Sequence, residues 1–277
     1  MSGKMRKISF EVIFQLFCAA VAAVMLFPVF YALSVSFMEH RHVLSRPPNL
    51  IPPTFTMDNY IHAFNRTPLM RYMYNSFVVA AICSVTRILL ASMAAYAYVF
   101  YRFRGRRILF ALTMATMMIP HEILIVSNFT TLSRMGLINT YAGLSAVFLI
   151  HASNIFLFRQ SFLSFAMDIR DAALIDGCGN FQFYYKILMP ISKPIITTVL
   201  ISSFVFVWNQ YVWPLMVTNR TEMRTVQVGI TMLKDRESTV FGPVMAGVVV
   251  AMIPTILIFI IFQKKIVAGM MSGAVKG

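Results

Sequence analysis

Charged side chains are scarce in this sequence of 277 residues. Asp, Glu, Lys and Arg make up only 12% of the residues, whereas 58% are hydrophobic and the mean hydropathy is +0.73. Soluble domains carry about twice that charged fraction, because their surface must be hydrated. The shortage argues against a water-soluble protein and predicts an integral membrane protein.

Acidic residues and cysteines are also few. Ten acids stand against 24 Lys and Arg, which gives a formal net charge of +14. Such an excess is typical of nucleic-acid binders, but these basic residues fall mostly in short loops between apolar runs, where membrane topology explains them better. The three cysteines, Cys18, Cys83 and Cys178, have spacings that predict neither a disulfide framework nor a zinc site. We therefore expect no nucleic-acid partner and no metal.

The sequence also lacks the patterns that chemistry requires. No nucleophile, base and orienting residue form a catalytic constellation. The run from Gly269 to Gly277 mixes glycines with Lys276, but its spacing is wrong for a phosphate-binding loop and no Ser or Thr follows the lysine. We expect a chain without enzymatic activity, without a cofactor and without its own nucleotide site.

Six apolar runs are long enough to cross a bilayer as helices. They predict an all-α membrane protein that forms a single transmembrane domain over residues 1–277. The first run is longer than the core of a signal peptide, so we interpret it as an uncleaved span. The expected spans are residues 12–37, 74–99, 108–129, 141–158, 195–217 and 243–262.

The basic residues predict the orientation of these spans. A dense cluster follows the second span and consists of Arg102, Arg104, Arg106 and Arg107. Lys and Arg are enriched in cytoplasmic loops, so this cluster is expected inside the cell. An even number of spans then places both termini in the cytoplasm.

The segment between the fourth and fifth spans, residues 159–194, is polar but patterned. Asp168 is placed to cap a first short helix, and Gly177 to end it. Asn180 is placed to cap a second helix. The second helix is expected to have an apolar face of Phe181, Tyr184, Tyr185 and Leu188, and to stop at Pro190 and Pro194. The segment therefore predicts a helix, a glycine turn and a helix on the cytoplasmic side.

This segment carries a distinctive set of residues: Asp171, Ala172, Ala173, Gly177, Ile187, Pro190 and Pro194. The set resembles the EAA loop of the membrane subunits of binding-protein-dependent ABC importers. The resemblance implies a coupling helix that sits in a cleft of a cytoplasmic ATPase, with Asp171, Ala172, Ala173, Gly177 and Pro190 as coupling residues. Asp171 stands where the family usually has Glu, one methylene longer. A loop that merely connects two spans is the alternative.

The C-terminal residues extend the resemblance. The ending from Gly269 to Gly277 looks like the C-terminus of the maltose-type branch of this family, whose tail reaches into the ATPase dimer. The resemblance implies that Gly273 and Lys276 contact the ATPase. A disordered polar end is the alternative.

Two ionisable residues stand where lipid makes them costly. Arg87 falls near the middle of the second span, where such a residue normally faces the bundle interior or water. It could attract an anionic substrate, or it could pair with Glu122 or with helix carbonyls. Glu122 and His121 follow Pro120, which predicts either a distorted helix along a pathway or a simple outer helix end.

Aromatic and amide residues gather in the fifth span at Trp208, Asn209, Gln210 and Tyr211. Amides bond hydroxyl groups and aromatic faces cover C–H surface, so the group suits a sugar or polyol pathway. An interfacial aromatic belt is the alternative. The sequence WNQYVWPL at residues 208–215, together with PHEI at residues 120–123, resembles the glycerol-3-phosphate branch of the family.

Taken together, the resemblance implies the type I ABC importer permease fold with a cytoplasmic coupling-helix loop. It implies a permease subunit in the inner membrane of a bacterium, importing sn-glycerol-3-phosphate or a carbohydrate. It also implies a second permease subunit, an ATPase dimer that binds ATP and Mg²⁺, and an extracytoplasmic solute-binding protein. The alternatives are an importer of a neutral sugar or oligosaccharide, a secondary transporter, or a structural membrane protein. A secondary transporter would need paired internal repeats, and none is visible.

Overall fold

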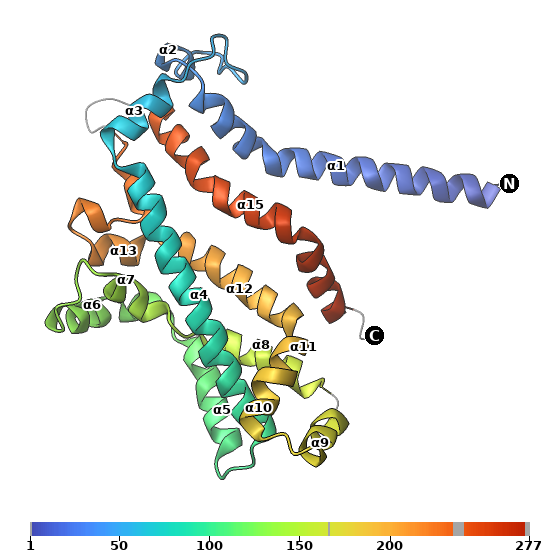
Figure 1. Cartoon of the computed structure of the whole chain (residues 1–277). Coiled ribbons are helices and arrows are strands. Elements are labelled where there is room, and N and C mark those ends of the chain that lie inside the picture. The colour runs from blue at the N-terminus through green and yellow to red at the C-terminus, as the bar shows by residue number, and fades with distance from the viewer. Residues whose placement is uncertain (1, 166, 235–240, 275–277) are drawn as a thin grey trace. The chain divides into compact units, whose positions relative to one another are not determined.

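The computed structural model describes residues 2–165, 167–234 and 241–274, and this part of the chain is helical (Figure 1). Its only strand-like pairing within these ranges is an isolated antiparallel bridge between Met38 and Phe55. The expected all-α fold class is confirmed. The chain divides into two compact units, residues 1–69 with 229–253 and residues 70–228 with 254–277.

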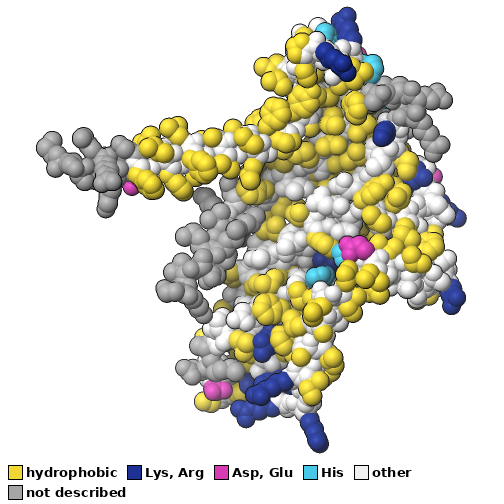
Figure 2. All heavy atoms as spheres, turned by 180° about the vertical axis from the view of Figure 1, so that it is seen from behind, with side chains coloured by type: hydrophobic (Ala, Val, Ile, Leu, Met, Phe, Trp, Pro, Cys, Tyr) yellow, Lys and Arg dark blue, Asp and Glu magenta, His cyan; other side chains and the backbone are white. Residues whose placement is uncertain are grey.

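Hydrophobic side chains cover much of the face shown in Figure 2, with Lys and Arg in separate patches and few acids. A soluble protein rarely leaves apolar surface exposed on this scale. The surface therefore agrees with a chain whose helices contact lipid or other membrane subunits.

The first unit contains α1 (Ser2–Ser36), α2 (His40–Val43), α3 (Asp58–Arg66) and the beginning of α15 (Phe241–Ala274). The side chain of Asn59 in α3 fixes the end of α1, because its amide donates to the carbonyls of Ser36 at 3.1 Å and Met38 at 2.7 Å. Ala63, Leu233 and Ala246 form a small buried core beside it.

Gly242 packs directly against Asn59, so a methyl group at this position would collide with the bonded amide. Replacement by alanine should destabilise the first unit by roughly 1–3 kcal/mol, the usual cost of overpacking a filled site. Thermal unfolding of the detergent-solubilised chain measures this. Gly247→Ala in the same helix is the matched control, because its methyl would meet the end of the Leu233 side chain and make ordinary contact with Ile230, and no hydrogen-bonded amide. Equal shifts for both variants would contradict the prediction.

The second unit begins with α4 and continues through a series of shorter helices. We call residues 164–192, between α8 and α12, the polar loop. The elements before it are α4 (Leu69–Phe100), α5 (Arg106–Ala115), η1 (Thr116–Met118), η2 (His121–Leu124), α6 (Ile125–Arg134), α7 (Tyr141–Ser145), η3 (Ala146–Phe148) and α8 (Ala152–Leu163). The later elements are α9 (Met167–Ile175), α10 (Asn180–Phe183), the π-helical turn η4 (Tyr184–Leu188), α11 (Met189–Ile191), α12 (Lys193–Trp208), α13 (Val212–Val217), η5 (Thr221–Met223) and α14 (Val226–Thr231). The rest of α15 also belongs to this unit.

Three stretches are continuous helices long and apolar enough to cross a membrane: Phe10–Ser36, Leu69–Phe100 and Phe241–Gln263. Three further pairs of helices meet the same criteria but are bent. Arg106–Met118 meets His121–Arg134 at 85°, Tyr141–Phe148 meets Ala152–Leu163 at 54°, and Asn180–Ile191 meets Lys193–Trp208 at 77°. Counting each bent pair as one span gives six.

The expected spans 108–129 and 141–158 are thus bent rather than straight. The expected span 195–217 is interrupted as well, because α12 ends at Trp208 and α13 begins at Val212. Pro120 explains the first interruption, because it cannot continue a helix without losing a hydrogen bond. The second falls at residues 149–151 and the third at residues 209–211, where the sequence holds no proline or glycine.

The core of the second unit joins α4, α8 and α12 to the polar loop between α8 and α12. Its fully buried side chains include Phe158 and Phe162 of α8 and Leu188 of the loop. The ring of Tyr96 in α4 lies tilted against that of Tyr184 in the loop, with ring centroids 5.2 Å apart. The loop is therefore packed onto the helical core rather than being a free connection.

Candidate functional site

A cavity of about 530 Å³ lies within the second unit, where three helix interruptions meet. The first interruption precedes His121, the second precedes Ala152, and the third separates α12 from α13. The lining residues are Arg87, His121, Glu122, Leu124, Ile125, Asn128, Val147, Phe148, His151, Phe206, Asn209, Gln210, Tyr211, Val212 and Trp213. Non-helical backbone at membrane depth is tolerated where it faces protein or water, which fits a polar cavity here.

Arg87 enters this cavity from α4 and is only 3% exposed. Its Nε donates to the carbonyl oxygen of Phe148 at 2.6 Å, and its guanidinium lies 5.0 Å from the ring centre of Phe206. A guanidinium has five N–H donors, and the Phe148 bond uses one of them. Of the pairings expected for Arg87, the helix carbonyl is the one observed.

Glu122 pairs with its neighbour His121, at 3.1 Å between Oε1 and Nε2. Both side chains are largely exposed at the cavity. His121 and His151 each lie beside the Phe206 ring, at centroid distances of 6.5 and 6.2 Å. The cavity therefore combines one buried arginine, two imidazoles and one carboxylate around a phenylalanine.

The amides of the third interruption are held by their own helix. Asn209 donates to the carbonyl of Val205 at 2.9 Å, and Gln210 donates to that of Phe206 at 3.2 Å. Asn209 also accepts a bond from Gln227 at 3.3 Å. These bonds hold the amides in place at the cavity wall, beside Tyr211.

Trp208 lies elsewhere. It is 2% exposed, stacks on Phe204 with ring centroids 5.7 Å apart, and is not among the residues that line the cavity. Trp208 follows Phe206 by two residues, which is about 200° around α12, so the two side chains face opposite sides of the helix. Trp213 is the tryptophan that does line the wall, with its Nε1 donating to the carbonyl of Gly143 at 3.1 Å.

His151 and Asn128 also line the cavity, although neither was predicted from the sequence. His151 follows an apolar run, and its Nδ1 lies 2.6 Å from the hydroxyl of Ser153. An isolated histidine in an apolar run is a sequence signal for a residue that faces a polar pathway. Asn128 had no such signal, because it sits among other polar residues. Within the described ranges, no three His, Cys, Asp or Glu residues are grouped to hold a metal.

The polar loop forms the second part of the candidate site. Gly177 has φ +77° and ends α9 as predicted. The amide of Gly177 donates to Leu174 at 3.1 Å, and the amide of Cys178 donates to Ala173 at 2.9 Å. This pair of bonds is the Schellman ending, which needs a left-handed residue and therefore favours glycine.

The second loop helix differs from its predicted start. Its N-cap residue is Gly179, no side chain caps it, and Asn180 is already helical. The Asn180 side chain is thus not the cap. The carbonyl of Asn180 instead accepts a hydrogen bond at 2.8 Å from the hydroxyl of Tyr96 in α4.

The predicted apolar face is also only half correct. Tyr184 and Leu188 are buried, but Phe181 and Tyr185 are exposed. Phe183, which was not predicted, is buried instead. The π-helical turn at Tyr184–Leu188 explains the shift, because its wider turn breaks the 3.6-residue period.

The loop ends differently from its prediction as well. Pro190 lies inside α11 and does not stop the helix, whereas Pro194 lies in the first turn of α12. The direction changes by 77° between them, near Ser192. Proline is tolerated in a first turn, where its missing N–H has no partner to lose.

The three predicted coupling residues that belong to α9 divide between its two faces. Ala173 is buried against the core, whereas Asp171 and Ala172 are exposed. Ile175 is 86% exposed and Phe181 is 70% exposed, and Asp176 lies beside them. The outward face of the loop is therefore an apolar surface with two acids.

Two hydroxyl contacts fasten this loop to α4. The first is Tyr96 to Asn180, described above. The second joins the hydroxyls of Ser92 and Tyr184 at 2.7 Å. Arg170 adds a cation–π contact, with its guanidinium 5.5 Å from the Phe100 ring centre. α4 therefore contacts the loop and also carries Arg87 into the cavity.

Of the two expected tail contacts, Gly273 lies at the end of α15. Lys276 lies outside the described residues.

Comparison with known proteins places this arrangement among transporters. The family described as "Binding-protein-dependent transport system inner membrane component" matches residues 87–272. The sn-glycerol-3-phosphate transport system permease protein UgpE of Brucella abortus (strain 2308) is 35% identical over 253 residues, which cover 88% of this chain and 90% of that protein. The arabinooligosaccharides transport system permease protein AraQ of Bacillus subtilis (strain 168) is 31% identical over 271 residues, covering 97% and 96%.

A solved structure has a similar fold. It is a crystal structure of a bacterial ABC transporter involved in the import of the acidic polysaccharide alginate. The TM-score is 0.81 at 23% sequence identity, and the match covers 92% of this chain and 95% of that one. At this identity the likeness concerns the fold.

Proposed function

Because the chain belongs to the family of binding-protein-dependent transport system inner membrane components, we propose that it forms half of the pathway through which an ATP-driven importer carries sn-glycerol-3-phosphate or a carbohydrate. The chain is a membrane-spanning permease subunit of an ABC importer, a kind of subunit that is not itself an enzyme. Its membership implies a partner ATPase, a second permease and a solute-binding protein.

The polar cavity is the observation that carries the proposal for the pathway. It brings together Arg87, Glu122, Asn209, Gln210 and Tyr211, which lie far apart in the sequence. Amide and hydroxyl groups there can bond the hydroxyls of a polyol, and the Phe206 ring can cover its C–H surface. Its volume of about 530 Å³ leaves room for a small polyol or a monosaccharide.

The charge of the cavity favours an anionic substrate. Arg87 has donors beyond the one that binds Phe148, and it is the residue type best suited to recognising phosphate. The resemblance to a glycerol-3-phosphate permease agrees with this choice. A neutral sugar is the second candidate, supported by the amides and by the likeness to an arabinooligosaccharide permease.

The polar loop is proposed as the element that couples transport to ATP hydrolysis. Asp171, Ala172 and Gly177 lie on or beside its exposed surface, and Ile175 supplies an apolar contact that a cleft in the ATPase would cover. Ala173 packs against the helical core, and Pro190 lies inside α11, so both are proposed to hold the shape of the loop. ATP and Mg²⁺ belong to the ATPase dimer, so this chain supplies no cofactor site of its own.

Transmission from loop to cavity is proposed to run along α4. Ser92 lies five residues after Arg87, which corresponds to a rise of about 7.5 Å along the helix. A force that moves the loop therefore acts on α4 close to the cavity. ATP-driven closure would make the helices outward-open, and hydrolysis would let them return to the inward-open state.

The topology completes the proposal. The family is an inner membrane component, and the arginines between α4 and α5 favour a cytoplasmic position for that connection. Both termini are then cytoplasmic, which puts Gly273 and Lys276 on the side of the ATPase. A secondary transporter or a purely structural protein would leave the exposed loop surface without a role.

The direct test is uptake of labelled sn-glycerol-3-phosphate by the complete complex in vesicles, with its own ATPase and binding protein. We expect uptake with ATP and none with ADP, because only ATP drives closure. Uptake of a neutral arabinooligosaccharide alone would keep the importer and reject the phosphate substrate. Failure of the chain to copurify with its ATPase would contradict the coupling proposal itself.

A further inference from the structure

The connection between α4 and α5 carries a second concave site that the transport pathway does not use. We call residues 102–107 the arginine loop, because Arg102, Arg104, Arg106 and Arg107 fall within it. A cavity of about 470 Å³ lies against this loop and is lined by Arg102, Phe103, Gly105, Arg106, Arg107 and Ile108. The hollow is open to the outside and places three of the arginines beside apolar side chains.

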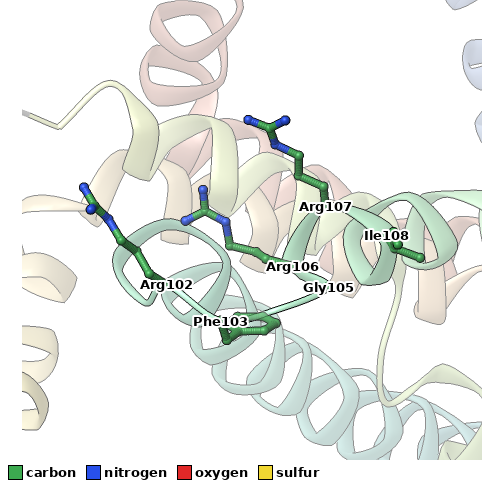
Figure 3. Close-up of a pocket in the computed structure, with 6 residues that line it drawn as sticks. All are labelled: Arg102, Phe103, Gly105, Arg106, Arg107 and Ile108. Atoms are coloured by element: carbon green, nitrogen blue, oxygen red, sulfur yellow. The ribbon is translucent and has the colours of Figure 1, made fainter.

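The backbone of the arginine loop turns sharply at Gly105. Gly105 has φ +85°, a left-handed conformation that reverses the chain just before α5. Arg106 then bonds back to the carbonyl of Tyr101 at 3.2 Å through Nη1. Figure 3 shows the guanidinium groups of Arg102, Arg106 and Arg107 on one side of the loop, with the Phe103 ring on the other.

The charges of the arginine loop are uncompensated. In the part of the chain that the structure describes, no carboxylate lies within ion-pair distance of the four arginines. A further guanidinium lies nearby, because Arg159 of α8 covers the Phe110 ring of α5 at 4.2 Å. Clustered cations of this kind attract an anion, and the attraction is strongest where lipid lowers the dielectric constant.

The surface that follows the arginines is apolar. Ile108, Leu109 and Leu112 of α5 are all exposed, and Ile108 is 67% exposed. An acidic protein surface would match the arginines but not the apolar face of α5, which belongs to a membrane-spanning segment. A phospholipid matches both parts, because its head group is anionic and its acyl chains are apolar.

We propose that the arginine loop binds the head group of an anionic phospholipid, with the acyl chains lying along the exposed face of α5. The lipid phosphate would accept hydrogen bonds from Arg102 and Arg107, while Arg106 keeps the loop folded through Tyr101. This site goes beyond the proposed transport function, because it depends on the membrane and not on the transported substrate.

The test compares binding of fluorescent phosphatidylglycerol to the purified complex of wild type and the double variant Arg102→Gln/Arg107→Gln. Arg106 is kept, so the loop retains its bond to Tyr101. We expect the apparent affinity to fall by roughly thirtyfold, since two cationic contacts are lost. Arg102→Lys/Arg107→Lys should restore most of the binding, because charge is retained.

Arg134→Gln/Arg220→Gln is the matched control, since both arginines are exposed and lie outside this cavity. Equal losses in the two double variants would overturn the proposal. So would displacement of the lipid by inorganic phosphate at equal concentration, which would indicate a soluble anion as the occupant. Loss of ATPase copurification with unchanged lipid binding would assign the arginine loop to the ATPase and reject the lipid.

Discussion

Replacing Gly177 by proline is expected to abolish ATP-driven uptake while the helical core stays folded. Gly177 has φ +77°, whereas proline is restricted to φ near −65°, and proline also lacks the N–H that donates to Leu174. These two losses cost on the order of 3 kcal/mol at the end of α9. The change should therefore reorient the exposed face that carries Asp171 and Ile175. Uptake per ATP hydrolysed, measured in vesicles, reports the loss.

The chain offers close controls for this experiment. Gly179 lies two residues away, has φ −66° and has open space around it, so Gly179→Ala should transport normally. Gly177→Asn should keep most of the activity, because asparagine tolerates the left-handed conformation better than other residues. A methyl group at Gly177 would meet no neighbour within 4 Å, so the expected effect is conformational and not steric. Normal uptake by the Gly177→Pro complex would remove the loop from the coupling mechanism.

Replacing Arg87 by methionine is expected to reduce uptake of sn-glycerol-3-phosphate by roughly ten- to hundredfold. A hydrogen bond to a charged group contributes about 1.5–3 kcal/mol, which corresponds to a factor of that size. Arg87 is the buried cation of the cavity, and methionine replaces it with a shorter unbranched apolar side chain that has no charge. Arg87→Lys should retain part of the activity.

A structural loss must be separated from a loss of substrate contact, because Arg87 also binds the Phe148 carbonyl. Arg71→Met is the matched control in the same helix, where the arginine is exposed and lies 5.8 Å from the Tyr74 ring centre. Basal ATPase activity of both variants should remain near wild type, and thermal unfolding measures how much stability Arg87→Met loses with the Phe148 bond. If Arg87→Met transports glycerol phosphate normally, Arg87 serves packing and the substrate is more plausibly neutral.

The sequence predicted those features whose cause is local. Gly177 was identified as a helix end because its left-handed conformation is a property of glycine itself. The long apolar runs identified the membrane class for a similar reason, since length and composition suffice. Residue types alone predict Arg87, Glu122, Asn209, Gln210 and Tyr211 for a substrate pathway. No local pattern predicts the shape of the cavity that they line, because it depends on how α4, α6, α8 and α12 pack.

The errors arise where packing overrides the local pattern. Phe181 and Tyr185 were expected to be buried, but the π-helical turn shifts the period so that Phe183 is buried instead. Trp208 was grouped with Asn209 because they are neighbours, yet the end of α12 directs them to different surroundings. The interruption at residues 149–151 carries no proline or glycine, so no helix-breaking residue marked it.

The three interruptions around the cavity also bear on how such a chain changes over evolutionary time. Residues at a helix interruption are not bound to the spacing of a regular helix, so each can be exchanged with little effect on the packing of the helices that flank it. His121, His151 and Gln210 stand at or beside different interruptions and reach the same space. A few substitutions there can alter the chemistry of the wall, while α4 and the loop packed on it remain unchanged. Substrate preference and the ATP-driven machinery are thus able to evolve separately within one chain.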